Sequence, residues 1–322
     1  MLNLPSWLGD ALNDALRHVP FHSETHAIKG VLALNRLRAV SSVDDDLLRT
    51  TLDFRELLTG AKVDVLVHEH VSYTTETLEE SRLQRMIEAP VFPMAYAAGA
   101  EWVKRHGYKH MVEHYKDRAI ERIGFLGHSW SIWCSFLEVE PYLTTDLQQR
   151  RAAERFVEFC APQLSSPHWT VVYDIDFALE THELDEDEII TSVLSRPGFY
   201  GHTVIALAHI LEYESLISPV QRRHAMKRMY DVSQKIRGIP VFDVEIPRPA
   251  HHNGESREQL DKAILGCLKN GSKEVHTVTL AAAILMLWNR VEPGHRAHLL
   301  AVLNFFAEWK IERTVGGEQK SS

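Results

Sequence analysis

The segment Gly198-Phe199-Tyr200-Gly201-His202-Thr203 opens an apolar run, Val204–Leu211, in which hydrophobic residues recur at three- and four-residue steps. That period is typical of an α-helix. A second segment, Gly124-Phe125-Leu126-Gly127-His128-Ser129, has almost the same sequence and also opens an apolar run. The chain therefore contains copies of one unit, in which a glycine-histidine pair stands directly before a helix.

A histidine recurs at one position of this unit. His128 and His202 are 74 residues apart (202 − 128), and the same step from 202 reaches His276. His26 opens an apolar run in a similar context. Imidazole suits iron, zinc, copper and nickel, so four such histidines facing one axis would form a metal site. The alternative interpretation is a packing signature, in which the glycines allow close helix approach and the histidine caps the helix.

The repeat predicts an all-α fold built from helical hairpins. After each apolar helix comes a short polar turn, Thr144-Thr145-Asp146 in one copy and Ser218-Pro219 in the next, and then a second amphipathic helix. Both turns carry residues that favour helix N-caps. Hairpins that recur in this way indicate a toroid or solenoid, and the long step predicts two hairpins per repeat.

Few stretches alternate like strands; only Val63–Val71 and Trp169–Ile175 are candidates. We expect one compact helical domain over residues 1–314, followed by a polar, glycine-containing and disordered tail at 315–322.

Composition excludes several classes of protein. A net charge of −9 argues against a nucleic-acid surface, which needs a clustered basic face. The longest apolar run, near Leu280–Trp288, is far shorter than the roughly 20 residues that cross a bilayer. The N-terminus shows no secretion signal, and three cysteines without short spacings are typical of free thiols. We therefore expect a cytoplasmic protein without a nucleic-acid or membrane partner, and its oligomeric state stays open.

Further side chains are candidates for the same site. Lys273 precedes His276 by three residues and shares its helical face, so it is a candidate ligand if carbon dioxide converts it to a carbamate. The alternative is a solvated lysine at a helix start. Five aromatic residues are candidate walls of a substrate pocket, with plain core packing as the alternative. They are Phe125, Trp130, Trp133, Phe199 and Tyr200.

Two other histidine groups have spacings that could chelate a metal. His68 and His70 would face the same way if Val67–His70 were a strand. His106, His110 and His114 follow the four-residue step of a helix, although nearby lysines and arginines favour a solvated basic face.

The motifs together resemble those of the questin oxidase-like family. His26 with its apolar helix looks like the first motif of that family, the two glycine-histidine segments look like its internal motifs, and Lys273-Glu274-Val275-His276 looks like its late lysine-x-x-histidine motif. The similarity runs sparsely from about residue 20 to 310, over a chain shorter than the fungal members. The order and number of the motifs carry it, because each motif is short.

The resemblance implies a largely helical, non-haem iron oxygenase of secondary metabolism. The family includes enzymes that open rings of anthraquinone-type polyketides with dioxygen. By carry-over, His26, His128, His202 and His276 would hold Fe(II), with Lys273 as a possible carboxylated ligand. Zinc or manganese are alternative metals, and NADPH is a candidate external reductant, although no motif for it is visible. Two other functions stay open: a metal-dependent hydrolase or lyase that uses the same pocket, and a helical-repeat binding scaffold without catalysis.

Overall fold

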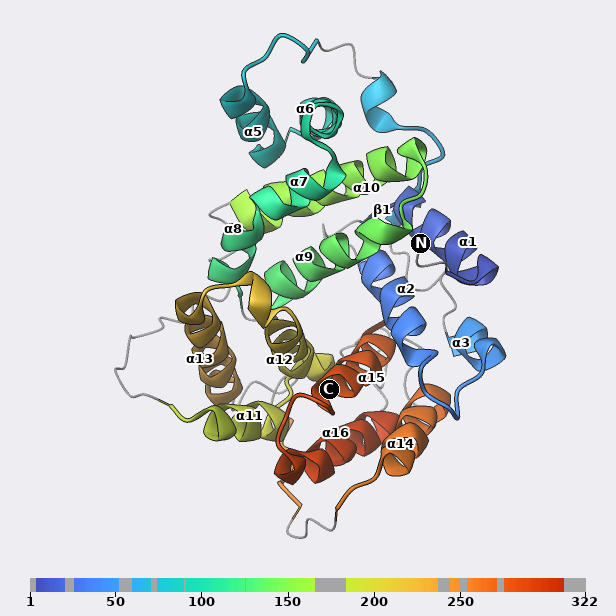
Figure 1. Cartoon of the computed structure of the whole chain (residues 1–322), viewed down its shortest axis with the longest axis vertical. Helices are drawn as coiled ribbons and strands as arrows, with labels where there is room; N and C mark the ends of the chain where they lie inside the picture. The colour runs from blue at the N-terminus through green and yellow to red at the C-terminus, as the bar shows by residue number, and fades with distance from the viewer. Residues whose placement is uncertain are drawn as a thin grey trace, which may run out of the picture.

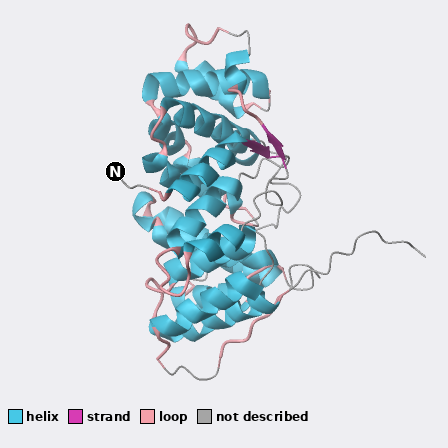
Figure 2. Ribbon diagram, turned by 90° about the vertical axis from the view of Figure 1, so that its right-hand side faces the viewer, coloured by secondary structure: helices cyan, strands magenta, loops and turns pink. Residues whose placement is uncertain are grey.

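The computed structural model describes residues 4–20, 26–51, 60–70, 74–89, 91–124, 126–165, 184–236, 244–249, 254–270 and 275–309. Helices make up most of this part of the chain, as Figure 2 shows. The predicted all-α class is confirmed. The α-helices are α1 Ser6–Arg17, α2 His26–Leu37, α3 Asp45–Thr51, α5 Glu80–Glu88, α6 Phe92–His106, α7 Tyr108–His114, α8 Lys116–Glu121, α9 His128–Val139, α10 Asp146–Phe159, α11 Glu186–Ser195, α12 His202–Glu212, α13 Pro219–Lys235, α14 Arg257–Asn270, α15 Val275–Leu287 and α16 Arg296–Glu308.

Four inner helices, α2, α9, α12 and α15, form a closed ring at the centre of the molecule (Figure 1). Each packs against the next in chain order, and α15 packs back against α2. These are the apolar runs that follow the four repeated histidines, and nearly every residue of α9, α12 and α15 is buried. Burial on most sides explains why these helices are largely apolar, with their polar residues gathered on the face that carries the histidine. The ring closes the repeat into a toroid rather than an open solenoid.

The same contact recurs at three joints of the ring. At each joint the residue before a histidine meets the residue four positions after the neighbouring histidine. A Cβ on Gly127 would lie 2.2 Å from Cβ of Ala206, and a Cβ on Gly201 would lie 2.7 Å from Cδ1 of Leu280. At the closing joint, a Cβ on Gly30 would lie 2.9 Å from Cγ2 of Val275. Close approach therefore requires a small residue on one side of each joint.

Outer helices flank each inner helix. Within the described residues, every inner helix has one helix before it and one after it, for example α11 and α13 around α12, or α14 and α16 around α15. Each of the two 74-residue steps thus holds three α-helices in the described part of the chain, where the step length predicted two hairpins. The helix pair α5–α6 is an insertion between the first two quarters, where the histidine step is 102 residues (128 − 26).

The predicted caps of the following helices are confirmed. The hydroxyl of Thr145 accepts a hydrogen bond from the backbone N–H of Gln148 at 3.1 Å, and the Gln148 side chain accepts from the backbone of Thr145. Ser218 and Gln221 make the same reciprocal pair at the start of α13. These capping boxes satisfy backbone N–H groups that the first helical turn leaves without intrahelical partners.

The strand predictions agree with the structure less well than the helix predictions do. The predicted strand Val63–Val71 was wrong over its described residues, because Val67–His70 forms a 3₁₀ turn. The only strands in the described ranges are β1 His18–Pro20 and β2 Gly60–Lys62, an antiparallel pair. Residues 169–175 lie outside the described part of the chain.

One hydrophobic core runs through all four quarters, in accord with a single compact helical fold. The predicted tail at 315–322 and the boundary at 314 lie outside the described residues. No helix in the described ranges has the length and apolar character needed to span a membrane.

Candidate metal centre

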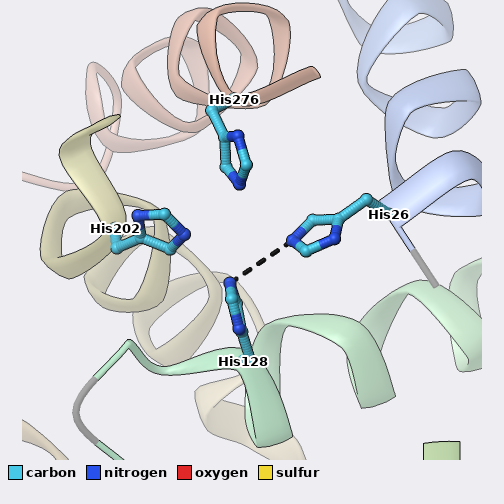
Figure 3. A group of neighbouring side chains, drawn as sticks. All are labelled: His26, His128, His202 and His276. Atoms are coloured by element: carbon cyan, nitrogen blue, oxygen red, sulfur yellow. Dashed lines mark hydrogen bonds between the residues drawn. The ribbon is translucent and has the colours of Figure 1, made fainter. Parts of the chain in front are cut away.

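The four repeated histidines meet at the middle of the ring (Figure 3). One potential ligand nitrogen from each of His26, His128, His202 and His276 lies within 4.8 Å of every other. Ring centroids of neighbours are 4.7–4.9 Å apart in the sequence 26, 128, 202, 276 and back to 26. The imidazoles therefore form a closed quadrangle, one from each inner helix, and their convergence favours a ligand role over a capping role.

Helix starts explain how the imidazoles converge. His26, His128 and His202 are the first residues of their helices, and His276 is the second residue of α15. Gly127 and Gly201 precede two of them in the left-handed conformation, with φ of 64° and 76°. Glycine adopts this conformation without the steric cost of a side chain. The four helices consequently point their N-termini, and the positive ends of their dipoles, at one centre.

A hydrogen bond to the backbone orients His202. Its Nδ1 donates to the backbone carbonyl of Phe199, which fixes the tautomer and leaves Nε2 as a lone-pair donor. Nε2 is buried and has no hydrogen-bond partner among the described residues. Burial, followed by the neighbouring imidazoles, holds the pKa of His202 well below its usual value. A buried neutral imidazole with a free lone pair is the form that binds a metal.

His26 lies next to His128, with 3.3 Å between their Nε2 atoms. Burial is the main cause that lowers the pKa of His26 well below its usual value, and the adjacent imidazoles and Lys29 add to it. Four nitrogens bound to one metal at 2.0–2.1 Å would lie about 3.3–4.2 Å apart. The observed separations reach 4.8 Å, so an ion would draw the rings inward by a few tenths of an ångström.

On each inner helix, the face that carries the histidine also carries further side chains that point into the ring. Positions three, seven and ten residues after a histidine share its face. At the third position Lys29 Nζ donates to Ser131 Oγ at 3.0 Å. At the tenth, Arg36 pairs with Glu138 at 2.9 Å and lies 3.8 Å from Glu212. A column of polar side chains therefore runs from the histidines to the opposite end of the ring.

A narrow cavity lies within this column. It is lined by residues of all four inner helices, including Lys29, Ser135, His209 and Thr279. About 10 Å³ is open to the centre of a water molecule, which is roughly the room for one water. The sequence pattern could have pointed to these residues. The step from His26 to His128 also leads from Lys29 to Ser131, and the step from His128 to His202 leads from Ser135 to His209.

Aromatic side chains cover the outer side of the histidines, which is the side away from the polar column. The Tyr200 ring stacks on His276 with centroids 4.9 Å apart, and Phe199 lies parallel to His202 at 6.0 Å. Trp309, just after α16, contacts the Tyr200 ring at 5.1 Å. Tyr200 has a φ of 51° and is the single non-glycine residue with positive φ in the described ranges. This conformation costs energy and is concentrated at functional sites in proteins.

The other predicted site residues lie elsewhere. Trp130 and Trp133 are fully buried and stack on each other at 4.8 Å, and Trp133 Nε1 donates to the carbonyl of Val112 in α7. That bond places Trp133 in the packing between α9 and an outer helix. Phe125 and Lys273 lie outside the described residues. Of the predicted pocket residues, Phe199 and Tyr200 therefore lie beside the histidines. Trp309 packs against Tyr200, and the sequence pattern did not point to it.

Neither of the other histidine groups forms a set close enough to share an ion, although the His106 and His110 rings stack at 5.0 Å beside Trp102. His68 lies in a 3₁₀ turn, where its Nδ1 is 2.8 Å from Oε1 of Glu154, so the predicted strand geometry with His70 is absent. His106 ends α6, Gly107 interrupts the helix, and His110 and His114 belong to α7 at exposed positions. Within the described ranges, the four ring histidines are the single set of three or more metal-binding side chains close enough to share an ion.

The fold and the site define an all-α toroid with a candidate four-histidine metal centre. Comparison with family models, with curated proteins and with solved structures found no match for the chain.

Proposed function

We propose that this protein is a non-haem iron oxygenase that acts on a planar phenolic or polyketide-type substrate. The observation that supports it most is the buried quadrangle of His26, His128, His202 and His276. The reaction class comes from the resemblance of the histidine motifs to the questin oxidase-like family. The first support is a matter of geometry and the second of sequence order, and both concern the same four histidines.

The donor set suits a divalent transition metal. Imidazole binds iron, copper, nickel and zinc, and four neutral donors leave the full charge of the ion without compensation from the protein. No carboxylate belongs to the group within the described residues. Such a centre would favour an anionic ligand such as a phenolate, and the converging helix N-termini would add to that preference. When bound, iron would supply Lewis acidity and one-electron redox chemistry.

The aromatic residues around the centre would position the substrate. Tyr200, Phe199 and Trp309 present flat side chains beside His276 and His202, and a polycyclic ring system would stack on them. Their burial of the outer side would also exclude water from the reacting carbon. A planar phenol bound in this way would have its oxygen close to the imidazole cluster.

Metal content tests the proposal first. We expect about one iron per chain in protein purified without added metal or reconstituted with Fe(II) without oxygen. His202→Ala should lose it, because removal of one of four ligands opens the site. His209→Ala is a matched control, since this buried histidine lies on the same helix but outside the quadrangle. It should keep the iron.

Oxygen uptake with a panel of polycyclic phenols then tests the reaction, measured for both variants with an electrode. Zinc or manganese without oxygen uptake would contradict the oxygenase and favour a hydrolase or lyase. Absence of any metal after reconstitution would contradict a metal function altogether, and would favour a binding scaffold.

A further inference from the structure

A group of buried ionisable side chains lies outside the ring, where α10 packs against the inserted helix α6. Glu154, Arg155 and Glu158 of α10 are 3%, 1% and 3% exposed, and none of them belongs to the candidate metal centre. Charged side chains are almost never buried to this degree unless they are paired. The partners of these three groups therefore decide what the contact between α10 and α6 can do.

Arg155 connects the two carboxylates. Its Nη2 donates to Oε1 of Glu158 at 2.6 Å and lies 3.8 Å from Oε2 of Glu154. Its Nη1 donates to the backbone carbonyl of Leu16 in α1 at 3.1 Å. The guanidinium is thus fixed from three sides, and it holds the Glu158 carboxyl group in one position.

Each carboxyl group also binds a segment that lies between the first two quarters of the ring. Oε1 of Glu154 accepts from the backbone N–H of His68 at 2.9 Å and lies 2.8 Å from its Nδ1, so Glu154 holds the 3₁₀ turn Val67–His70. Oε1 of Glu158 accepts from the Tyr96 hydroxyl of α6 at 2.7 Å. Because α6 packs against α5, this single bond connects the inserted α5–α6 pair to α10.

Carboxyl groups outnumber cations in this group, since one guanidinium faces two of them. Oε2 of Glu158 is buried and has no hydrogen-bond partner among the described residues. An ionised carboxylate shares its charge between both oxygens, so part of the charge would lie on a buried atom without a donor, which is costly. A proton on Oε2 removes that charge, and Oε1 still accepts both of its bonds. Burial accordingly raises the pKa of Glu158 to about 7, against the lowering effect of Arg155.

The charges that act on Glu158 are chiefly those of Arg155 and Glu154. The π-helical segment Cys160–Ser165 has no charged side chain, and those of α7 are exposed. His18 in β1 lies near Arg155, and burial lowers its pKa, so it is neutral at pH 7. Other charged groups of α1, α6 and α10 have partners of their own. They are Arg17 with Asp14 and Asp64, Glu101 with Lys104 and Arg105, His106 with Glu80, Arg150 with Asp146 and Glu69, and Arg151 with the carbonyl of Asp64.

We propose that Glu158 is a proton-dependent latch, which holds the α5–α6 pair against α10 while its carboxyl group is neutral and loosens the pair when the carboxyl group ionises. The proton leaves to solvent, and the negative charge then has to be hydrated at Oε2. Water reaches this buried oxygen only if α6 separates from α10. The latch is independent of the proposed function, because its bonds connect the insertion to an outer helix and involve none of the four histidines.

Infrared spectroscopy tests the protonation directly, because the C=O stretch of a neutral carboxyl group absorbs apart from that of a carboxylate. The parent protein should show a neutral-carboxyl band that disappears with a midpoint near pH 7. Glu158→Gln should lack this band. Glu101→Gln is the matched control, since it removes another buried carboxyl group, which pairs with Arg105 at 2.7 Å, and it should keep the band. A band that persists in Glu158→Gln, or no such band in the parent protein, would overturn the proposal.

Hydrogen exchange of the α6 amides tests the loosening. After correction for the intrinsic pH dependence of exchange, their protection in the parent protein should fall by up to about tenfold per pH unit between about pH 5 and pH 7, and level off above it. The reason is that the opened form, with an ordinary carboxyl pKa of 4.5, releases a proton that the closed form keeps. Glu101→Gln should keep this slope.

In Glu158→Gln the amide imitates the neutral acid, so the protection of α6 should stay constant over the same range. A slope that persists in this variant, or constant protection in the parent protein, would show that Glu158 does not control the contact.

Tyr96→Phe provides a second test, which also serves if Glu158→Gln does not fold by circular dichroism. The substitution removes a hydrogen bond that lowers the pKa of Glu158, so the midpoint of the infrared band should move to higher pH. An unchanged midpoint would mean that the proton lies on another group, and the latch would be rejected.

Discussion

His209 shows how strongly the interior of the ring acts on a titratable side chain. It is buried on α12, and its Nδ1 donates to the carbonyl of Ile205 at 2.7 Å. Lys29 and Arg36 face it from α2, and Glu138 and Thr279 line the same cavity from α9 and α15. Burial, followed by the charge of Lys29, lowers the pKa of His209 from 6.5 to about 3.

This pKa predicts an acid-labile fold. In the unfolded chain His209 takes up a proton below pH 6.5, whereas in the folded protein it stays neutral down to about pH 3. The free energy of unfolding should therefore fall as the pH drops through this range, by up to about 1.4 kcal/mol per pH unit for this one residue. His209→Leu should show a correspondingly shallower loss between pH 6 and pH 4, measured by urea unfolding of the metal-free protein.

His224→Leu, at an exposed position on α13, is the control for replacing a histidine with leucine. Parallel pH profiles for the parent protein and His209→Leu would show that His209 is protonated in the folded state. The electrostatic description of the interior would then be incorrect.

Among the contacts between elements, the joint of α9 and α12 leaves the least room. Gly127 has a φ of 64°, and its missing Cβ would lie 2.2 Å from Cβ of Ala206. Gly127→Ala should cost about 2–4 kcal/mol of unfolding free energy, through the left-handed conformation and the overlap together. Thermal or urea unfolding measures this, and it should be accompanied by weaker metal binding because His128 follows directly.

Gly266→Ala on α14 is the matched substitution. No atom lies within 4 Å of the Cβ that it adds, and alanine is the better helix former, so it should stabilise by about 0.5–1 kcal/mol. Similar effects of the two substitutions would contradict the close packing of the ring.

The sequence predicted the inner helices and the four histidines because one repeat step of 74 residues connects three of them. It also held information that the pocket prediction did not use. Trp130 and Trp133 follow His128 by two and five residues, which places them about 200° and 140° around the helix, on the side away from the centre. Helical geometry alone could have assigned them to packing.

Other features could not be predicted from local pattern. β1 and β2 have three residues each, which is too short for an alternation of polar and apolar residues to be visible. The role of His68 depends on Glu154, a residue 86 positions away along the chain. Trp309 reaches the site only because α16 ends beside Tyr200. Each of these depends on tertiary contacts between segments that are distant in sequence.

At the scale of the whole molecule, a metal at the centre would join all four quarters of the ring. A ligand that binds only the folded state stabilises it by about 2.7 kcal/mol at a hundredfold excess over its Kd. Anaerobic Fe(II) should therefore raise the Tm by roughly 5 °C for a chain of this size. Differential scanning calorimetry would show the shift in the parent protein and in His209→Ala. An equal shift in His202→Ala would place the metal somewhere else.

The order of the four inner helices along the chain has a consequence for how the site assembles during synthesis. The quadrangle takes one imidazole from each quarter, and the last of them along the chain, His276, belongs to α15. During synthesis a ribosome-bound chain holds first one, then two, then three of the imidazoles, and the closing contact of α15 with α2 forms last. The complete four-histidine centre can therefore arise only after α15 has been synthesised, and at every earlier stage the growing chain lacks at least one of the four imidazoles.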